Sequence, residues 1–261
     1  MVSQSGALCA AIIDWAGAHP VGFSCVVSVG DTADIGFGDV LDYLALDPDT
    51  RSILMYIEGV RDARRFMSGL RAAARLKPVV VIKAGRKPPG ARAALSHTGT
   101  LVGADDVFEA ALQRAGAVRA DTIEQLFAAA QLLATRTRLT GNRLVIITNA
   151  GGPGVMATDQ VVEHGLELST LSAETLNTLA TALPSPGHYD NPVDLQEDAP
   201  PDRFARALDI SLKDSSVDGA LVLLTPQAMT QPTAAAAGLI DVATAASKPV
   251  LTCWLGDGQV R

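Results

Sequence analysis

A histidine with small neighbours is the first residue of this sequence that could do chemistry. His97 lies between Ser96 and Thr98 and is followed by Gly99, so its imidazole is unobstructed. The segment 83–103 is rich in glycine and proline and follows an apolar run, which predicts a long loop at the ligand-binding edge of an α/β sheet. A lone histidine usually has no catalytic task, and it is this loop that favours a function for His97.

A nucleophilic imidazole needs a partner that holds its second nitrogen and stabilises positive charge. Glu58 is the best candidate, because it directly follows the apolar run 53–57. The carboxyl ends of parallel strands meet at one edge of a sheet, so Glu58 and His97 are predicted to share that edge. A carboxylate at a strand end can also be merely solvated, and its spacing alone leaves both interpretations open.

Two turns rich in small residues are candidate phosphate-binding sites. In each of them a strand leads into a helix, where free backbone N–H groups and the positive end of the helix dipole attract an anion. Serine hydroxyls would add donors to the first turn, whereas glycines in the second permit close approach and positive φ angles. Such turns often serve packing alone, which is the alternative for each. The residues are Ser3, Ser5 and Gly6 in the first turn and Gly151, Gly152 and Gly154 in the second.

Short apolar runs alternate with helical patterns along the whole chain. The runs are typical of buried parallel strands, and the segments between them have apolar residues at three- and four-residue spacing. This alternation predicts an α/β protein with parallel sheets covered on both faces. The strands are expected at residues 25–29, 53–57, 79–82, 144–148, 220–224 and 250–254, and the helices at 7–18, 38–46, 63–75, 104–116, 122–135, 155–164 and 201–213.

The two halves of the chain repeat one another. Each half opens on one of the small-residue turns and closes on a similar strand, residues 77–85 in the first and 248–256 in the second. We therefore predict two α/β domains, residues 1–138 and 139–261, with the boundary in the polar stretch 137–142. Only two residues precede the first turn, so we expect the first strand to be cut short and the chain to be a fragment of a longer protein.

The composition restricts the partners and the compartment. A net charge of −7 argues against a nucleic-acid partner, which requires clustered lysine and arginine. No apolar run reaches the roughly 18 residues of a membrane span, so no membrane association is expected. Cys9, Cys25 and Cys253 lack metal-ligand spacing and form no even set, which indicates no metal site and a reduced, cytoplasmic protein.

Six motifs run through nearly the whole chain in the order of a known family. They are Ser3-Gln-Ser-Gly-Ala-Leu8, Tyr56-Ile-Glu58, Lys83-Ala-Gly-Arg86, Ser96-His-Thr-Gly99, Asn149-Ala-Gly-Gly-Pro-Gly154 and Asn191-Pro-Val-Asp-Leu195. On these residues the sequence resembles the NDP-forming acyl-CoA synthetases, relatives of succinyl-CoA synthetase. The resemblance implies two flavodoxin-like domains. The first is similar to part of the succinyl-CoA synthetase α subunit and the second to the C-terminal domain of the β subunit.

The resemblance also implies roles for the candidate residues. His97 matches the histidine that becomes phosphorylated, in a phosphohistidine loop with Ser96, Thr98 and Gly99. Glu58 matches the carboxylate that orients this histidine. The two small-residue turns match the helix N-termini that hold the phosphohistidine between the two domains.

The implied reaction is that of an ADP-forming acid–thiol ligase. Acyl-CoA and phosphate give acyl phosphate and CoA, the phosphoryl group passes to His97, and ADP accepts it with the help of Mg²⁺; synthesis from ATP runs the other way. Nothing in the sequence resembles the family's CoA-binding Rossmann domain or its ATP-grasp domain, so both are expected as missing partners within the same protein, in a homo-oligomer. The isolated chain is expected to be inactive and to bind at most a phosphate or sulfate.

Two other functions stay open at this point. The stretches 62–67 and 194–199 look more like a branch of the family that is fused to a GNAT acetyltransferase, where this region is an acyl-CoA-sensing regulatory module of a protein lysine acetyltransferase. Members of that branch can lose the histidine, whereas this chain keeps His97. A simple phosphate-binding α/β module is the third interpretation, but it does not explain why both turns, Glu58 and His97 all match.

Overall fold

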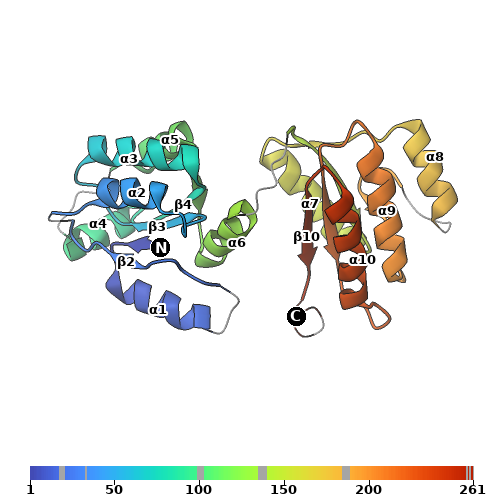
Figure 1. Ribbon diagram of the computed structural model, residues 1–261, viewed down its shortest axis with the longest axis horizontal. Coiled ribbons are helices and arrows are strands. Elements are labelled where there is room, and N and C mark those ends of the chain that lie inside the picture. The colour runs from blue at the N-terminus through green and yellow to red at the C-terminus, as the bar shows by residue number, and fades with distance from the viewer. Residues whose placement is uncertain are drawn as a thin grey trace. The chain divides into compact units, whose positions relative to one another are not determined.

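The structure, a computed structural model, describes residues 1–17, 21–32, 34–98, 103–134, 140–183, 189–256, 258 and 260. At His97, Thr98 and Ala134 the description is confined to the backbone. The chain folds into two compact units, Met1–Arg136 and Thr137–Arg261 (Figure 1). Each unit is an α/β domain with its own parallel sheet and its own buried core.

The first unit is built on a five-stranded sheet in the order β2-β1-β3-β4-β5, with every pair of strands parallel. All of β4 is buried, and so is all of β3 except Tyr56. This strand order is that of flavodoxin-like sheets, whose connections change direction between β1 and β3 and leave a ligand-binding crevice at the carboxyl ends there. The strands are β1 Val2–Ser3, β2 Val27–Ser28, β3 Ile53–Ile57, β4 Val79–Lys83 and β5 Val118–Ala120.

Helices cover both faces of this sheet (Figure 1). On one face α2, α3 and α5 bury Leu41, Phe66 and Leu112 in the largest core of the unit. On the other face α1 and α6 contribute Ile12 and Leu126 to a second core. The helices described in this unit are α1 Gly6–Gly17, α2 Phe37–Leu46, α3 Ala63–Leu76, α4 Pro88–Thr98, α5 Asp105–Ala115 and α6 Ile123–Ala134.

Two glycines set the contact between α2 and α3. A Cβ on Gly38 would come within 2.7 Å of the carbonyl oxygen of Arg65, and a Cβ on Gly69 would come within 2.7 Å of the carbonyl oxygen of Gly38. Neither position can accept a side chain unless the helices move apart. The close approach fixes the N-termini of both helices at the carboxyl edge of the sheet.

The second unit repeats the architecture around a sheet in the order β10-β9-β6-β7, with β8 also paired to β6. One face carries α8, α9 and α10, which bury Leu179, Phe204 and Leu239, and the other carries α7, which buries Val161. The strands are β6 Arg143–Thr148, β7 Glu167–Leu168, β8 Val193–Asp194, β9 Gly219–Leu224 and β10 Val250–Trp254, and the helices are α7 Gly151–Glu163, α8 Ala173–Ala182, α9 Pro201–Lys213 and α10 Pro232–Ala245.

The structure confirms the α/β class with two parallel, flavodoxin-like sheets, and it adds elements that the sequence patterns did not predict. The loop predicted over residues 83–103 is wrong between Pro88 and Thr98, where α4 forms. Pro88 and Pro89 lie in its first turn, where proline is tolerated because no intrahelical N–H bond is needed there. The additional strands β5, β7 and β8 have only two or three residues, too few for an apolar run, and β1, which was expected as a shortened strand, has two. None of the described helices is long and apolar enough to span a bilayer.

Candidate functional site

The first small-residue turn connects β1 to α1 at the carboxyl edge of the first sheet. The hydroxyl of Ser3 accepts a hydrogen bond from the Ser5 N–H and donates one to the Ser5 carbonyl, both at 3.0 Å. The Ser5 hydroxyl accepts from the Leu8 N–H at 3.2 Å and so caps α1, which begins at Gly6. Ser3 is fully buried and holds the turn together. The hydroxyl hydrogen of Ser5 can still donate to a ligand.

Glu58 lies beside this turn, directly after β3, and only 8% of its surface is exposed. Its backbone N–H donates to Oε1 of Gln4 at 2.6 Å, and the N–H of Gly59 donates to the same oxygen at 3.0 Å. Its carbonyl oxygen accepts from Nζ of Lys83 at 2.7 Å. Burial raises the pKa of the nearby Tyr56 hydroxyl, and the Glu58 carboxylate raises it further. The predicted catalytic carboxylate therefore lies at the switch point between β1 and β3.

Lys83 is the last residue of β4 and is only 5% exposed. Besides the Glu58 carbonyl, its ammonium group donates to the Ala84 carbonyl and lies 5.7 Å from the ring centroid of Phe108 on α5. Burial lowers the pKa of Lys83 to about 8, although the carboxylate of Asp105 opposes that shift. A buried cation needs such partners, and two of the three N–H donors of Lys83 have a carbonyl acceptor here.

A cluster of ion pairs lies next to Lys83, between α5 and the connections around β5. Arg119 donates to Asp105 at 2.5 Å and to Glu109 at 2.8 Å. Arg86 pairs with Asp105 at 3.3 Å and also with Asp121. Burial alone would raise the pKa of Asp105, but the two guanidinium groups hold it below its usual value. Arg86 is thus engaged with carboxylates in this structure.

The residues expected around the phosphohistidine lie at the end of α4. The exposed Ser96 donates its hydroxyl to the carbonyl of Arg92 one turn earlier in the helix, at 3.0 Å. The backbones of His97 and Thr98 form the last turn of α4, and their side chains lie outside the described part of the molecule, as does Gly99. The predicted pairing of His97 with Glu58 therefore stays a prediction.

The second small-residue turn connects β6 to α7 and has the same construction as the first. The hydroxyl of Thr148 accepts from the Ala150 N–H at 3.1 Å and donates to the Ala150 carbonyl at 2.9 Å, as Ser3 does with Ser5. Asn149 is fully buried and bonds both the N–H and the carbonyl of Thr225, at 2.8 Å each. Thr225 directly follows β9, so each turn holds the residue after the neighbouring strand.

The glycines of the second turn differ from what the sequence led us to expect. Gly151, Gly152 and Gly154 lie in the first turn of α7 and do not use the positive φ angles that glycine permits. A Cβ on Gly151 or Gly152 would meet nothing within 4 Å, so their backbone is open to a ligand. A Cβ on Gly154 would come within 3.1 Å of the Thr148 methyl group, so this glycine allows close packing of α7 on β6.

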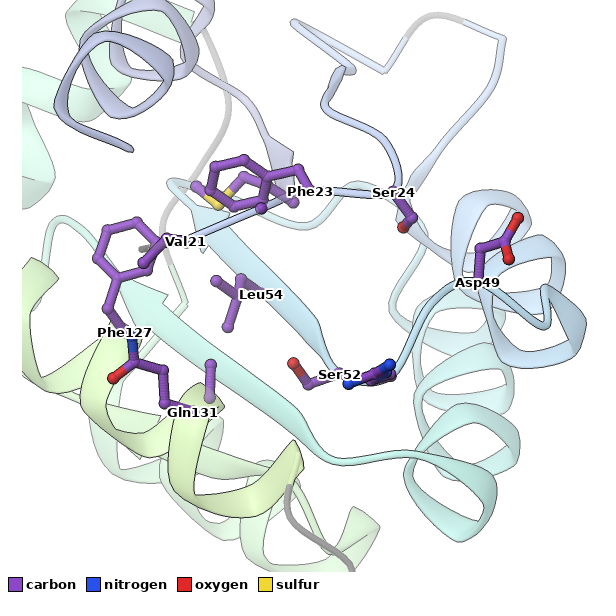
Figure 2. A pocket seen from close by; sticks show the side chains of 12 residues that line it. Val21, Phe23, Ser24, Asp49, Ser52, Leu54, Phe127 and Gln131 are labelled. Atoms are coloured by element: carbon purple, nitrogen blue, oxygen red, sulfur yellow. The ribbon is translucent and has the colours of Figure 1, made fainter. Parts of the chain in front are cut away.

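Two cavities of the first unit lie at opposite edges of its sheet. The larger, about 390 Å³, lies at the amino ends of the strands, where Phe23 and Phe127 line one side and Ser52 the other (Figure 2). Open α/β sheets bind ligands at the carboxyl ends, so this cavity lies away from the candidate site. The smaller, about 120 Å³, lies at the carboxyl edge, and Val60 in its wall is two residues from Glu58.

Sequence reasoning missed Gln4, Lys83, Asn149 and Thr225 as parts of the site. Lys83 had a detectable signal, because a charged residue at the end of a fully apolar strand must find buried partners. Gln4 and Asn149 occupy the middle of the two turns, where only the serines and glycines had suggested a role. Among the described residues, no group of three or more His, Cys, Asp or Glu side chains is placed to hold a metal ion, and the three cysteines are free.

Known proteins match both units of the chain. Residues 1–133 match the succinyl-CoA ligase like flavodoxin domain, and residues 144–261 match the ligase-CoA domain. The chain is 42% identical over 259 residues to acetate–CoA ligase (ADP-forming) I of Archaeoglobus fulgidus, which covers 99% of this chain and 37% of that protein. It is 43% identical over 232 residues to the alpha subunit of acetate–CoA ligase (ADP-forming) I of Pyrococcus furiosus, covering 89% of this chain and 50% of that subunit.

A solved structure agrees with these matches. The dinucleotide forming acetyl-coenzyme A synthetase 1 of Ca. Korarchaeum cryptofilum, in complex with phosphate and ADP, has a TM-score of 0.90 and 35% identity to this chain, over 99% of this chain and 57% of that one. The chain thus spans between 37% and 57% of the length of these three relatives. On its two domain matches, its sequence identity and its fold, the chain belongs to the NDP-forming acyl-CoA synthetase family.

Proposed function

We propose that this chain is the phosphoryl-relay core of an ADP-forming acyl-CoA synthetase and that His97 carries the phosphoryl group. Phosphate attacks the thioester carbon of acyl-CoA, CoA leaves as the thiol, and acyl phosphate forms. One imidazole nitrogen of His97 then attacks phosphorus, and the acyl carboxylate leaves. The phosphohistidine passes its phosphoryl group to ADP, and the reverse sequence makes acyl-CoA from ATP.

The position of Glu58 is the observation that carries this proposal. Glu58 is the carboxylate that the family resemblance pairs with His97, and it lies buried at the switch point of the first sheet with its backbone held on both sides. A fixed carboxylate keeps an imidazole in one tautomer and stabilises the positive charge that develops on it during transfer. We propose this role for Glu58.

The phosphoryl oxygens require donors, and the start of α1 offers them. The Ser5 hydroxyl and the free N–H groups at the first turn of α1 lie at the same edge as Glu58. A phosphohistidine carries about two negative charges, and a helix N-terminus stabilises such a group by roughly 0.3–2 kcal/mol. Gly151 and Gly152 give the start of α7 a similarly open backbone, and we propose it as the second phosphate-binding turn.

The remaining chemistry belongs to parts outside this chain. We propose that a CoA-binding Rossmann domain and an ATP-grasp domain complete the enzyme, as a cytoplasmic homo-oligomer. Mg²⁺ would accompany the nucleotide in the ATP-grasp domain, as the family resemblance implies. The relatives compared above are named as ligases, and no observation supports the alternative of a sensing module in a GNAT acetyltransferase.

Phosphorylation of His97 is the direct test. The full-length protein incubated with γ-labelled ATP and Mg²⁺ should gain a phosphoryl group that is labile to acid and stable to base, as a phosphohistidine is. The His97→Asn variant should gain none. His164→Asn is the matched control, because His164 is an exposed histidine at the end of α7 and should not change the labelling. Label that persists in His97→Asn would refute the assignment.

A further inference from the structure

The backbone around Glu58 is held by two side chains from neighbouring segments, and this arrangement has a function of its own. We propose that Gln4 and Lys83 are positioning residues of the phosphoryl transfer, which act by fixing the two peptide groups that flank the Glu58 side chain. The inference rests on the proposed function of His97 and Glu58. It adds two residues to which neither the family resemblance nor the comparisons give a role.

Gln4 holds the peptide groups on both sides of Glu58. Its Oε1 accepts from the N–H groups of Glu58 and Gly59, at 2.6 and 3.0 Å. The backbone N–H of Gln4 itself donates to the Tyr56 carbonyl at 3.2 Å, so Gln4 is part of the ladder between β1 and β3. The side chain thus ties the first residues after β3 to the turn that leads into α1, across the switch point of the sheet.

Lys83 holds the C-terminal side of Glu58. Its ammonium group donates to the carbonyl oxygens of Glu58 and Ala84, and its remaining surface lies against Phe108. Removing a lysine charge from water is costly, and burial accordingly lowers its pKa to about 8 against the opposing effect of the Asp105 carboxylate. An apolar residue would avoid this cost, so the lysine at this position is better explained by what it does for Glu58.

The second unit shows that a strand end of this kind can be built without the lysine. The Ala84 N–H donates to the Ile57 carbonyl at 2.9 Å, and the Leu255 N–H donates to the Leu224 carbonyl at 2.9 Å, so Lys83 and Trp254 occupy equivalent positions. The residue equivalent to Glu58 is Thr225, and Asn149 alone bonds both its N–H and its carbonyl.

A lysine is therefore present at this strand end in the unit that has the carboxylate and absent in the unit that lacks it, although both units have the same fold. Once both of its peptide groups are fixed, Glu58 can move only about its own side-chain bonds. The carboxylate then turns about a backbone position that does not move while the imidazole gains and loses a phosphoryl group. A displacement of about 1 Å of such a group can cost about 100-fold in rate.

The test measures the rate of His97 phosphorylation in the full-length protein with either positioning residue removed. Lys83→Met and Gln4→Met keep the size of each side chain and remove its hydrogen bonds, and each should slow labelling about 10- to 100-fold with little change in the KM for ATP. Lys83→Arg keeps the charge and the donors and should recover part of the rate. Gln4 is only partly buried, so Gln4→Met is the variant to use if Lys83→Met does not fold.

Lys77 provides a matched control in the same unit. Its ammonium group also bridges two backbone carbonyls, those of Leu44 at 2.7 Å and Asp47, but at the amino edge of the sheet. Lys77→Met should therefore change stability without changing the labelling rate of the folded protein by more than about twofold. An equal slowing by Lys77→Met and Lys83→Met would mean that both act through general destabilisation, and would overturn the proposal.

Double variants separate this proposal from the proposed function. If Gln4 and Lys83 act through Glu58, then Lys83→Met combined with Glu58→Gln should label no more slowly than Glu58→Gln alone, because the shared effect is counted once. Additive losses would refute the positioning role and leave His97 and Glu58 in place. Label that persists in His97→Asn would instead refute the proposed function.

Discussion

The two units are alike at the amino edges of their sheets and differ in the side chains at the carboxyl edges. At the amino edge Lys77 donates to the Asp47 carbonyl after α2, and Lys248 likewise donates to the Asp214 carbonyl after α9. At the carboxyl ends of the equivalent strands β4 and β10, the backbone is also alike, because Gly85 and Gly256 both adopt positive φ angles, +71° and +98°. These common features belong to the folding of the unit.

At the carboxyl edges, three equivalent backbone positions carry different side chains in the two units. The first unit has Gln4, Glu58 and Lys83 where the second has Asn149, Thr225 and Trp254. The first set contains an ionisable carboxylate with a buried cation behind it, whereas the second has neither charge. The comparison teaches that the same backbone frame carries a charged edge in one unit and an uncharged edge in the other, which under the proposed function would stabilise a changing charge in the first unit and offer backbone donors in the second.

The largest effect should come from exchanging the residues that follow the central strands. Glu58→Gln keeps the hydrogen bonds but cannot stabilise an imidazolium, and should slow His97 phosphorylation by about 100- to 1000-fold. Thr225→Val, at the equivalent position, should change the rate by less than about threefold. Rapid-quench labelling of the full-length protein measures both. Equal effects of the two substitutions would show that the units do not divide the work in this way.

A second prediction concerns the stability of the uncharged carboxyl edge. Asn149→Ala leaves the N–H and the carbonyl of Thr225 without their partner in a buried place, and should lower the free energy of unfolding by about 2–4 kcal/mol. Asn177→Ala, on the exposed surface of α8, should cost less than about 0.5 kcal/mol. Hydrogen exchange of the β6 and β9 amides would locate the loss. Unchanged exchange there would mean that Asn149 does not hold the strand end.

The smallest effect is a pH dependence confined to the charged edge. Because the pKa of Lys83 is lowered to about 8 in the folded state, the unfolded chain binds more protons between about pH 8 and pH 10.5. The free energy of unfolding should therefore rise with pH across that window, by at most about 1.4 kcal/mol per pH unit. The charges that set this shift, besides burial, are those of Asp105, Arg119 and Glu58.

The control for this prediction is the variant that cannot titrate. Denaturant unfolding at pH 7.5 and pH 9.5 should show the gain in the wild-type protein and lose it in Lys83→Met. The Lys248→Met variant, at the amino edge of the second unit, should keep the gain. A wild-type protein that loses stability over this interval relative to Lys83→Met would contradict the lowered pKa.

The sequence was sufficient to predict a strand wherever that strand is long enough to form an apolar run. The run 53–57 coincides with β3, because a strand buried on both faces favours a continuous apolar run. The run 250–254 coincides with β10, although this edge strand is partly exposed and includes Thr252. The short strands β1 and β7 carry no such run, and α4 begins with prolines and a glycine that resemble a loop. These elements form because their neighbours supply the partners, which a local pattern does not contain.

The motifs of the candidate site could be predicted from the sequence, but the hydrogen bonds that join them could not. The turn at Ser3 and the carboxylate at Glu58 could be found as small or charged residues at strand ends. The bond from Gln4 to Glu58 joins residues 54 apart in sequence, and it requires the strand order in which β1 lies beside β3. For the same reason the second turn gave no sign that Asn149 reaches Thr225, 76 residues away.

The burial of Lys83 also affects how readily this lysine could be acylated by a reaction intermediate. Acyl phosphates acylate amines, and an amine attacks only in its unprotonated form, which is a larger fraction near neutrality for a lysine with a pKa of about 8 than for an ordinary lysine. If acyl phosphate forms at this edge, as proposed, an accessible lysine with that pKa would be modified by the enzyme's own intermediate. Lys83 is only 5% exposed and its hydrogens are committed to two carbonyl oxygens, whereas Lys87, four residues later, is exposed. The same packing that holds Glu58 in place keeps this amine away from the reagent.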